Sequence, residues 1–242
     1  MTERLSPERA EEISENWKRI CENVAEAEEA AKRAGRFSSP VRIVAATKKV
    51  GPEDIRCACE AGLRELGENR VQEFASKFYS YPEEAEKHFI GRLQTNKVRT
   101  IVGRVSLIQS VDSLHLAAEI GKRAQMLGMA QDVLIELNIG READKGGVLP
   151  EQIGAFLENA AEIGGISVVG MMVIGPVCRD EEEQKKIFDE SYQIFIDNFV
   201  NTRHNSIRGK ILSMGMSGSY RTAIACGANM IRPGSALFGP RS

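Results

Sequence analysis

Short apolar segments and longer amphipathic segments alternate eight times along this chain, and no other feature limits the possible folds as strongly. The apolar segments are rich in β-branched and aliphatic residues, as strands buried on both faces are. A segment with apolar residues at helical spacing follows most of them, which indicates parallel strands joined by helices. We place the strands within residues 41–49, 63–69, 88–93, 106–111, 132–139, 166–174, 211–216 and 230–232.

Eight such units in 242 residues predict a single α/β domain, residues 1–242, with the (β/α)8 or TIM-barrel fold. The rival fold is an open doubly wound sheet, but its Gly-x-Gly-x-x-Gly turn after the first strand is absent. An extra helix is predicted at 6–34, because Ser6 and Pro7 are typical of helix starts and Gly35 is typical of a helix end. We expect this helix to cover one side or the bottom of the barrel.

Composition excludes several classes of function. The formal net charge is -2 and no basic run is interleaved with aromatic residues, so we expect no nucleic-acid partner. No apolar run reaches the roughly 18 residues of a membrane span, and the polar start of the chain is not a secretory signal. The five cysteines form no Cys-x-x-Cys pair and no metal-ligand spacing with the three histidines. We therefore expect a cytoplasmic protein with reduced thiols and no metal site.

Lys48 follows the first apolar run directly. In parallel α/β folds the carboxyl ends of the strands surround the ligand site. A poorly solvated lysine there loses its proton readily, and a neutral amine forms a Schiff base with a carbonyl compound. The alternative is that Lys48 merely solvates the end of the strand. In a closed barrel, one pocket would be surrounded by Lys48, Asn69, Arg92, the 140–147 loop, Ser217 and Arg232.

Two loops late in the sequence have the composition of a phosphate site. Residues 213–219 and 232–235 end the last two predicted strands, and both bring glycines and serines to the start of a helix. Backbone N–H groups at such starts point at anions, and barrels commonly hold phosphate with these two loops. The alternative is that the glycines and serines are only turns and caps.

Arg232 cannot give up its proton, so it would keep a pyridine nitrogen that faces it unprotonated. The alternative role for Arg232 is an ion pair with a neighbouring acid.

Six segments carry a resemblance to a known family, in order and over nearly the whole chain: residues 43–48, 67–73, 88–97, 170–172, 213–217 and 231–239. The blocks Gly67-Glu68-Asn69 and Met214-Gly215-Met216-Ser217 are specific, and the set resembles the YggS/PROSC family of pyridoxal phosphate homeostasis proteins. The resemblance implies the barrel of the alanine racemase N-terminal domain (fold type III) and a bound pyridoxal 5'-phosphate (PLP), a form of vitamin B6. It also implies a set of roles: Lys48 forms the Schiff base, Ser217, Gly234 and Ser235 hold the phosphate, Arg232 faces the pyridine nitrogen, and Asn69 and Met214 line the pocket.

Two stretches depart from the family pattern. The segment Thr47-Lys48-Lys49-Val50-Gly51 stands where the family usually has Ser-Lys-Thr-Lys-Pro. Residues 218–221 lack an acid that usually follows the Met-Ser pair. Both departures leave the lysine and the two phosphate loops intact.

Three functions remain open from the sequence. The first is a non-catalytic carrier that buffers or delivers PLP to PLP-dependent apoenzymes, and we favour it and expect a monomer. The second is an amino-acid racemase of the alanine racemase type, which takes its second acid/base, a tyrosine, from a carboxyl-terminal β domain of a partner subunit. Here the sequence stops at Ser242, just after the last predicted strand and its helix. The third is a barrel enzyme that acts on a phosphorylated sugar.

Overall fold

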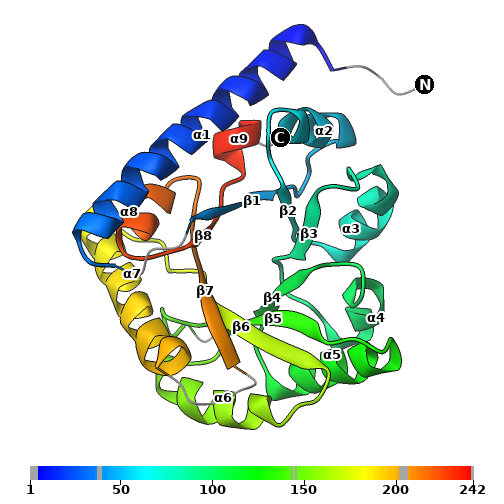
Figure 1. Cartoon of the computed structure of the whole chain (residues 1–242), viewed down its shortest axis with the longest axis vertical. Coiled ribbons are helices and arrows are strands. Elements are labelled where there is room, and N and C mark those ends of the chain that lie inside the picture. Colours follow the sequence, from blue (N-terminus) through cyan, green and yellow to red (C-terminus); the bar gives the residue numbers. More distant parts are fainter. Residues whose placement is uncertain (1–4, 37–39, 143, 145, 202–206, 241–242) are drawn as a thin grey trace.

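The computed structural model describes residues 5–36, 40–142, 144, 146–201 and 207–240, and within these residues eight parallel strands close into a barrel. Figure 1 shows the strands as an inner ring with the helices around it. The first strand pairs in parallel with the second and with the eighth, which closes the ring. The (β/α)8 prediction and the extra helix before the first strand are therefore confirmed.

The elements follow the predicted alternation of strand and helix. The strands are β1 (Arg42–Ala46), β2 (Glu65–Glu68), β3 (Glu86–Phe89), β4 (Leu107–Val111), β5 (Gln131–Leu137), β6 (Ile166–Val173), β7 (Ile207–Met216) and β8 (Met230–Arg232). The helices are α1 (Pro7–Arg33), α2 (Pro52–Glu60), α3 (Val71–Lys77), α4 (Val98–Ile101), α5 (Leu114–Met126), α6 (Ile153–Ala161), α7 (Glu181–Phe195), α8 (Tyr220–Ala225) and α9 (Ser235–Phe238). Short turns of 3-10 helix form η1 (Phe78–Ser80), η2 (Thr95–Lys97) and η3 (Pro150–Gln152), and a π-helical turn, η4 (Ile196–Val200), continues α7.

Most strands differ from their predicted bounds by a few residues, and the differences are largest for β7 and β3. β7 begins at Ile207 rather than at residue 211, because its first residues still pair with β6. β3 ends at Phe89 rather than at residue 93. The chain turns away there at Gly91, where an added Cβ atom would lie 2.1 Å from the backbone oxygen of Asn69. A glycine at this position lets the end of β3 pack against the loop after β2.

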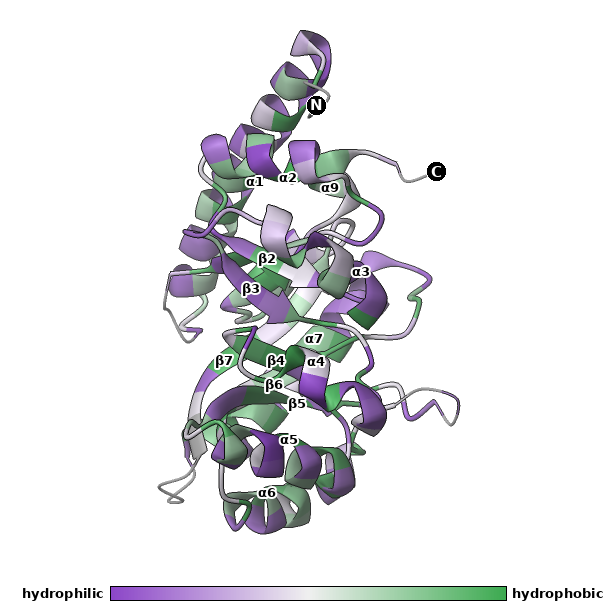
Figure 2. Cartoon of the chain, turned by 90° about the vertical axis from the view of Figure 1, so that its right-hand side faces the viewer, coloured by the Kyte–Doolittle hydropathy of each residue, from purple (hydrophilic) through white to green (hydrophobic). Residues whose placement is uncertain are grey.

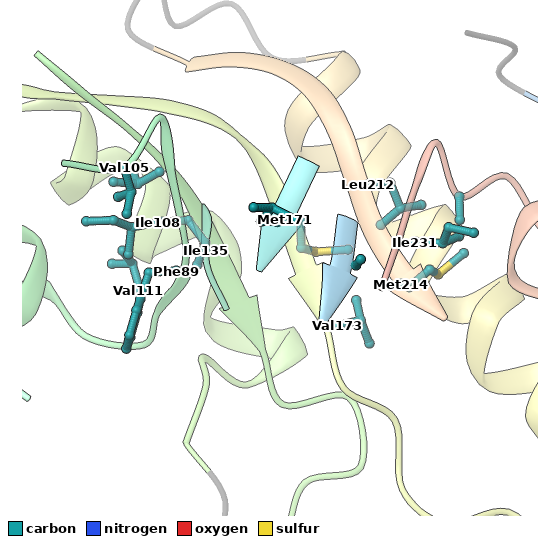
Figure 3. Packing of buried hydrophobic residues seen from close by; sticks show 14 of the residues in the cluster. Phe89, Val105, Ile108, Val111, Ile135, Met171, Val173, Leu212, Met214 and Ile231 are labelled. Carbon is teal, nitrogen blue, oxygen red and sulfur yellow. The ribbon is translucent and has the colours of Figure 1, made fainter. Parts of the chain in front are cut away.

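The hydrophobic core has two layers. The inner layer fills the barrel with Val44, Ile90, Leu107, Leu134, Val169, Met172 and Met230. The outer layer lies between the strands and the helices, and Figure 3 shows part of it, with Phe89 and Ile108 in one group and Leu212, Met214 and Ile231 in another. Figure 2 shows that β3 is largely hydrophilic beside a hydrophobic β4. The barrel wall therefore includes polar residues, and β3 carries several of them.

The helix α1 lies across the part of the barrel that is made from the end of the chain. In Figure 1 it runs beside α8 and α9. Ser6 caps its start by accepting the N–H of Arg9, as predicted. Further along, the buried Asn16 donates its side-chain N–H to the Leu237 carbonyl at 3.0 Å, and Arg9 donates to the Phe238 carbonyl at 2.8 Å. These bonds fix α9 in place.

Among the described residues, no helix combines the length and the apolar composition that crossing a membrane requires.

Two glycines within helices distinguish the effect of helix propensity on stability from the effect of packing. Gly121 in α5 is buried against the turn before β6, and a Cβ atom there would lie 2.4 Å from the Gly164 carbonyl oxygen. Gly154 in α6 is exposed, and the nearest atom to its added Cβ is 3.7 Å away. Propensity alone favours alanine at both positions by about 1 kcal/mol. Of the two positions, only Gly121 is packed so closely that packing opposes this gain in stability.

We therefore expect Gly121→Ala to destabilise the fold by about 1–3 kcal/mol, because a methyl group has no room beside backbone atoms. The matched variant Gly154→Ala should be neutral or more stable by up to about 1 kcal/mol. Urea unfolding monitored by circular dichroism measures both values. Equal effects of the two substitutions would show that α5 does not approach the β6 turn this closely.

Candidate functional site

Closure of the barrel brings the predicted lysine and the predicted phosphate loops to one seam. β1 pairs with β8 so that Ile43 lies opposite Ile231. Past the paired residues, Ala46 donates its N–H to the Pro233 carbonyl at 2.8 Å. Lys48 comes two residues after Ala46, and Gly234 directly follows Pro233. The turn that carries Lys48 therefore lies next to the loop between β8 and α9.

The turn at Lys48 is held on both sides by side chains of α3. Lys77 donates its ammonium N–H to the Thr47 carbonyl at 2.9 Å. Glu73 accepts the N–H of Lys49 at 2.7 Å and also bonds Lys77 at 3.1 Å. Lys49 has a φ of 59°, a left-handed conformation that is unfavourable for a lysine and needs such support. The backbone on either side of Lys48 is thus fixed, while its own side chain is exposed at the rim.

A buried carboxylate lies beneath this turn. Glu68 is 2% exposed and forms an ion pair with Lys77 at 3.1 Å. Its oxygens also accept hydrogen bonds from Thr47 at 3.3 Å and from the Tyr81 hydroxyl at 3.4 Å. Burial, together with the charge of Glu68, raises the pKa of Tyr81, so that the phenol stays protonated and can donate. Burial acts to raise the pKa of Glu73, but hydrogen bonds from Lys49 and Lys77 outweigh it and leave that pKa lowered.

Asn69 has a buried acceptor without a hydrogen bond. Its side-chain Oδ1 has no partner among the described residues, although the atom is shielded from solvent. The Asn69 backbone N–H is held by the Glu68 carboxylate at 2.8 Å, which fixes the residue at the end of β2. A buried polar oxygen without a partner is unfavourable, so a ligand with a donor group at this position would be stabilised.

The predicted phosphate loops meet through Ser217. Its hydroxyl oxygen accepts the N–H of Gly234 at 2.9 Å and the N–H of Ala236 at 3.1 Å. The two backbone N–H groups therefore point at one position, which a phosphate oxygen would occupy beside the Ser217 hydroxyl or in its place. The N–H groups of Gly218 and Ser235 have no acceptor in the described part of the chain. The arrangement fits an anion that is bound between the β7–α8 and β8–α9 loops.

Arg232 is buried and points its donors at neutral acceptors. It is 4% exposed, and its guanidinium donates to the Ser213 hydroxyl at 2.6 Å and to the Val173 carbonyl at 2.8 Å. Among the described residues Arg232 forms no salt bridge, so the alternative of an ion pair is not observed. Burial lowers the pKa of Arg232 to about 10, against the opposing charge of Glu136. The residue lines a cavity of about 300 Å³ together with Gly215 and Gly218.

Other predicted members of the pocket lie in different surroundings. Met214 is fully buried in the layer between the barrel wall and the helices, so its side chain would have to move to contact a ligand (Figure 3). Arg92 is largely exposed, with Asp112 at 3.9 Å. The 140–147 loop contains residues 143 and 145, which lie outside the described residues. The role of Met214 therefore stays a prediction.

Sequence reasoning missed the supports of the site. Glu68, Glu73 and Lys77 form the cluster that holds the Lys48 turn, yet none of them was a predicted site residue. One signal was present: Glu68 is an acid at the end of a predicted strand, and an acid that is buried there needs a cationic partner. The prediction for Lys48 also assumed poor solvation of its amine, whereas the side chain is exposed in this structure.

Comparisons with known proteins agree with this geometry. The model of the family described as alanine racemase, N-terminal domain, matches residues 13–242. A pyridoxal phosphate homeostasis protein of Aquifex aeolicus is 40% identical over 228 residues, which cover 94% of this chain and 97% of that protein. A protein of the same description from Helicobacter pylori is 37% identical and covers 82% of this chain and 87% of its own length.

Solved structures are similar over most of the chain. PipY of Synechococcus elongatus, solved with PLP bound, is 30% identical and superposes with a TM-score of 0.74, covering 88% of this chain and 100% of that one. Alanine racemase of Corynebacterium glutamicum superposes with a TM-score of 0.71, covering 96% of this chain and 62% of that one. At 15% identity, the second likeness concerns the fold alone.

We expect Lys77→Met to destabilise the fold by about 3–5 kcal/mol, because it leaves the Glu68 carboxylate buried without its cation. Adding Glu68→Gln should restore part of the loss, since the neutral amide needs no counter-charge. Lys32→Met is the matched control: its ion pair with Glu29 is exposed, so little change is expected. Urea unfolding at neutral pH measures all three variants, and a Lys77→Met protein as stable as the control would contradict the buried ion pair.

Proposed function

The chain belongs to the alanine racemase N-terminal domain family and, within it, to the pyridoxal phosphate homeostasis proteins, and on this premise we propose that it binds PLP and takes part in intracellular PLP homeostasis. The observation that carries the proposal is the seam between β1 and β8, where the Lys48 turn meets the Ser217–Gly234 loops. A ligand with an aldehyde at one end and a phosphate at the other fits that pair of features. The PLP-bound PipY structure supports the same ligand.

Each predicted site residue except Met214 receives a role in this proposal. The Lys48 amine attacks the aldehyde carbon and, with loss of one water molecule, holds the ligand as a Schiff base. Ser217, Gly234 and Ser235 supply hydroxyl and backbone donors to the phosphate, and Arg232 faces the ring nitrogen. The unpartnered Oδ1 of Asn69 accepts a hydrogen bond at the pocket wall. PLP supplies the reactive carbonyl and the electron-accepting ring, and the chain supplies the fixed turn and the anion site.

A carrier is favoured over an amino-acid racemase. Two-base racemisation needs an acid/base group on each face of the substrate carbon. Tyr220 is the tyrosine nearest to the phosphate loop in sequence, but it is buried and its hydroxyl accepts a hydrogen bond from Asn23 of α1 at 2.9 Å. This contact turns the phenol toward α1 and supports a packing role. The relatives that align over nearly their whole length carry the homeostasis description, whereas the racemase likeness concerns the fold.

The proposal extends to setting and partners. We propose a single-domain, monomeric protein of the cytoplasm, in which residues 1–242 act as one unit. In this role it buffers PLP or delivers it to PLP-dependent apoenzymes, without turnover of its own. Exposure of Lys48 at the rim supports exchange of the ligand with the surroundings, since the linking atom can be reached from outside.

Lys48→Arg and Lys49→Arg test the linkage with matched changes. Purified protein incubated with PLP should develop the absorbance band of a protein-bound Schiff base, and borohydride followed by peptide mass mapping should place the label on Lys48. We expect Lys48→Arg to lose the band, because a guanidinium does not form the imine, and Lys49→Arg to keep it. Label on Lys49 in the unmodified protein would reject the assignment.

The racemase alternative has its own measurement. We expect no measurable racemisation of alanine or serine by the PLP-loaded protein, because the Tyr220 hydroxyl is bonded to Asn23 of α1 and does not serve as a second acid/base group. Chiral chromatography after long incubation detects slow turnover. Racemisation that disappears in Lys48→Arg would replace the carrier function with the enzymatic one. A protein that stays colourless with PLP and converts a phosphorylated sugar would support the third function.

A further inference from the structure

A line of polar side chains crosses the otherwise apolar interior of the barrel. It starts at Arg232 in β8 and passes through Ser213 in β7, Gln109 in β4 and His88 in β3. Ser213, Gln109 and His88 are 0% exposed. Buried polar groups destabilise a core unless each is hydrogen-bonded, so a complete line of them needs an explanation.

Each member contacts the next within hydrogen-bond distance. The Arg232 guanidinium donates to the Ser213 hydroxyl at 2.6 Å, and that hydroxyl donates to the Gln109 carbonyl oxygen at 2.8 Å. The Gln109 amide nitrogen lies 3.0 Å from Nδ1 of His88. On the other side of the ring, Nε2 of His88 lies 3.5 Å from the Glu86 carboxylate and 3.7 Å from that of Glu65.

The donors in this line all point in one direction. If Gln109 donates to Nδ1 of His88, the histidine is the neutral Nε2–H tautomer and donates onward to the Glu86 carboxylate at 3.5 Å. The opposite orientation of the Gln109 amide would place its oxygen at 3.2 Å from the sulfur of Met230, where the nitrogen now donates. A line that begins at a cation, ends at anions and keeps one direction is stabilised cooperatively.

The anionic end lies at the amino-terminal mouth of the barrel. Arg42 donates to Glu65 at 2.8 Å and to Glu86 at 2.9 Å. Glu65, Glu86 and His88 also present ligand atoms within 4.8 Å of one another, a spacing that could hold a metal ion. Arg42 already supplies positive charge to both carboxylates. The hydrogen bond from His88 and then the charge of Arg42 lower the pKa of Glu86 against the effect of burial, which keeps it an acceptor.

We propose that Ser213, Gln109 and His88 are positioning residues that hold the Arg232 guanidinium in place through a directed hydrogen-bond relay anchored at Glu86. The inference rests on the proposed function, because the group that Arg232 would face is the PLP ring nitrogen. Val173 fixes a second N–H of the guanidinium, so the relay and this carbonyl together define its plane. The relay therefore sets the position from which the Arg232 guanidinium faces the ring nitrogen of PLP.

The first test examines the hydrogen bonds of the relay in the protein without PLP. Histidine labelled with 15N in the full-length protein reports the tautomer of each ring by NMR, and His88→Gln assigns the signal. We expect the Nε2–H tautomer for His88. We also expect its Nδ1 signal to move in Ser213→Ala and in Gln109→Met. A His88 that is protonated at Nδ1 would overturn the direction of the relay.

The second test measures how the relay affects bound PLP. With PLP bound, the pH titration of the absorbance band should shift by about one pH unit in Ser213→Ala, which removes a hydrogen bond to the charged guanidinium. Gln109→Met should shift it in the same direction, because the Ser213 hydroxyl loses its acceptor. Two buried residues outside the relay serve as controls. Ser110→Ala removes a bond to the Gly91 carbonyl, and Gln131→Met removes bonds at the barrel wall. Both controls should leave the titration unchanged.

The outcomes separate the relay from the proposed function. If PLP forms no band with the unmodified protein, the proposed function fails, while the NMR signals still decide whether the relay exists. If PLP binds and neither relay variant changes the NMR signal or the titration, the relay fails alone. Equal shifts in the relay variants and in the controls would show a general loss of packing and would overturn the positioning role.

Discussion

The pairing of β1 with β8 is the constraint on which the rest of this structure depends. Two register pairs, Arg42 with Met230 and Ile43 with Ile231, join the start of the sheet to its end. This closure removes both free edges of the sheet. It also sets the Lys48 turn beside the loop of Gly234, and neither segment forms the candidate site without the other. The site is therefore a product of the topology rather than of one local motif.

The fold followed from local patterns, whereas part of the site did not. The alternation of strands and helices predicts the barrel, and glycines and serines after β7 and β8 mark the phosphate loops, because both signals are local in sequence. The contact of Lys77 with Glu68 depends on how α3 packs under the β1 turn, so no spacing rule reveals it. The orientation of Met214 depends on strand alternation, in which neighbouring residues face opposite sides.

Two sets of polar side chains support the candidate site. One lies under the Lys48 turn and consists of Glu68, Glu73 and Lys77, which fix backbone atoms. The other crosses the interior from Arg232 to His88 and fixes a side chain. In the first, the buried Glu68 is compensated by an ion pair with Lys77, and in the second, the Arg232 guanidinium is hydrogen-bonded to neutral groups. Rigid supports of this kind suit a protein that holds a ligand in a fixed orientation.

The bonds between α1 and α9 have a consequence for how the chain acquires its structure. Asn16 and Leu237 are 221 residues apart in sequence, yet they meet in the finished molecule. Contacts of such long sequence separation slow folding, because a large loop must close before they form. During synthesis, α1 is made before α8 and α9, so the face that packs on them stays uncovered until they follow. Apolar surface that is exposed in this way makes an incompletely folded chain prone to aggregate.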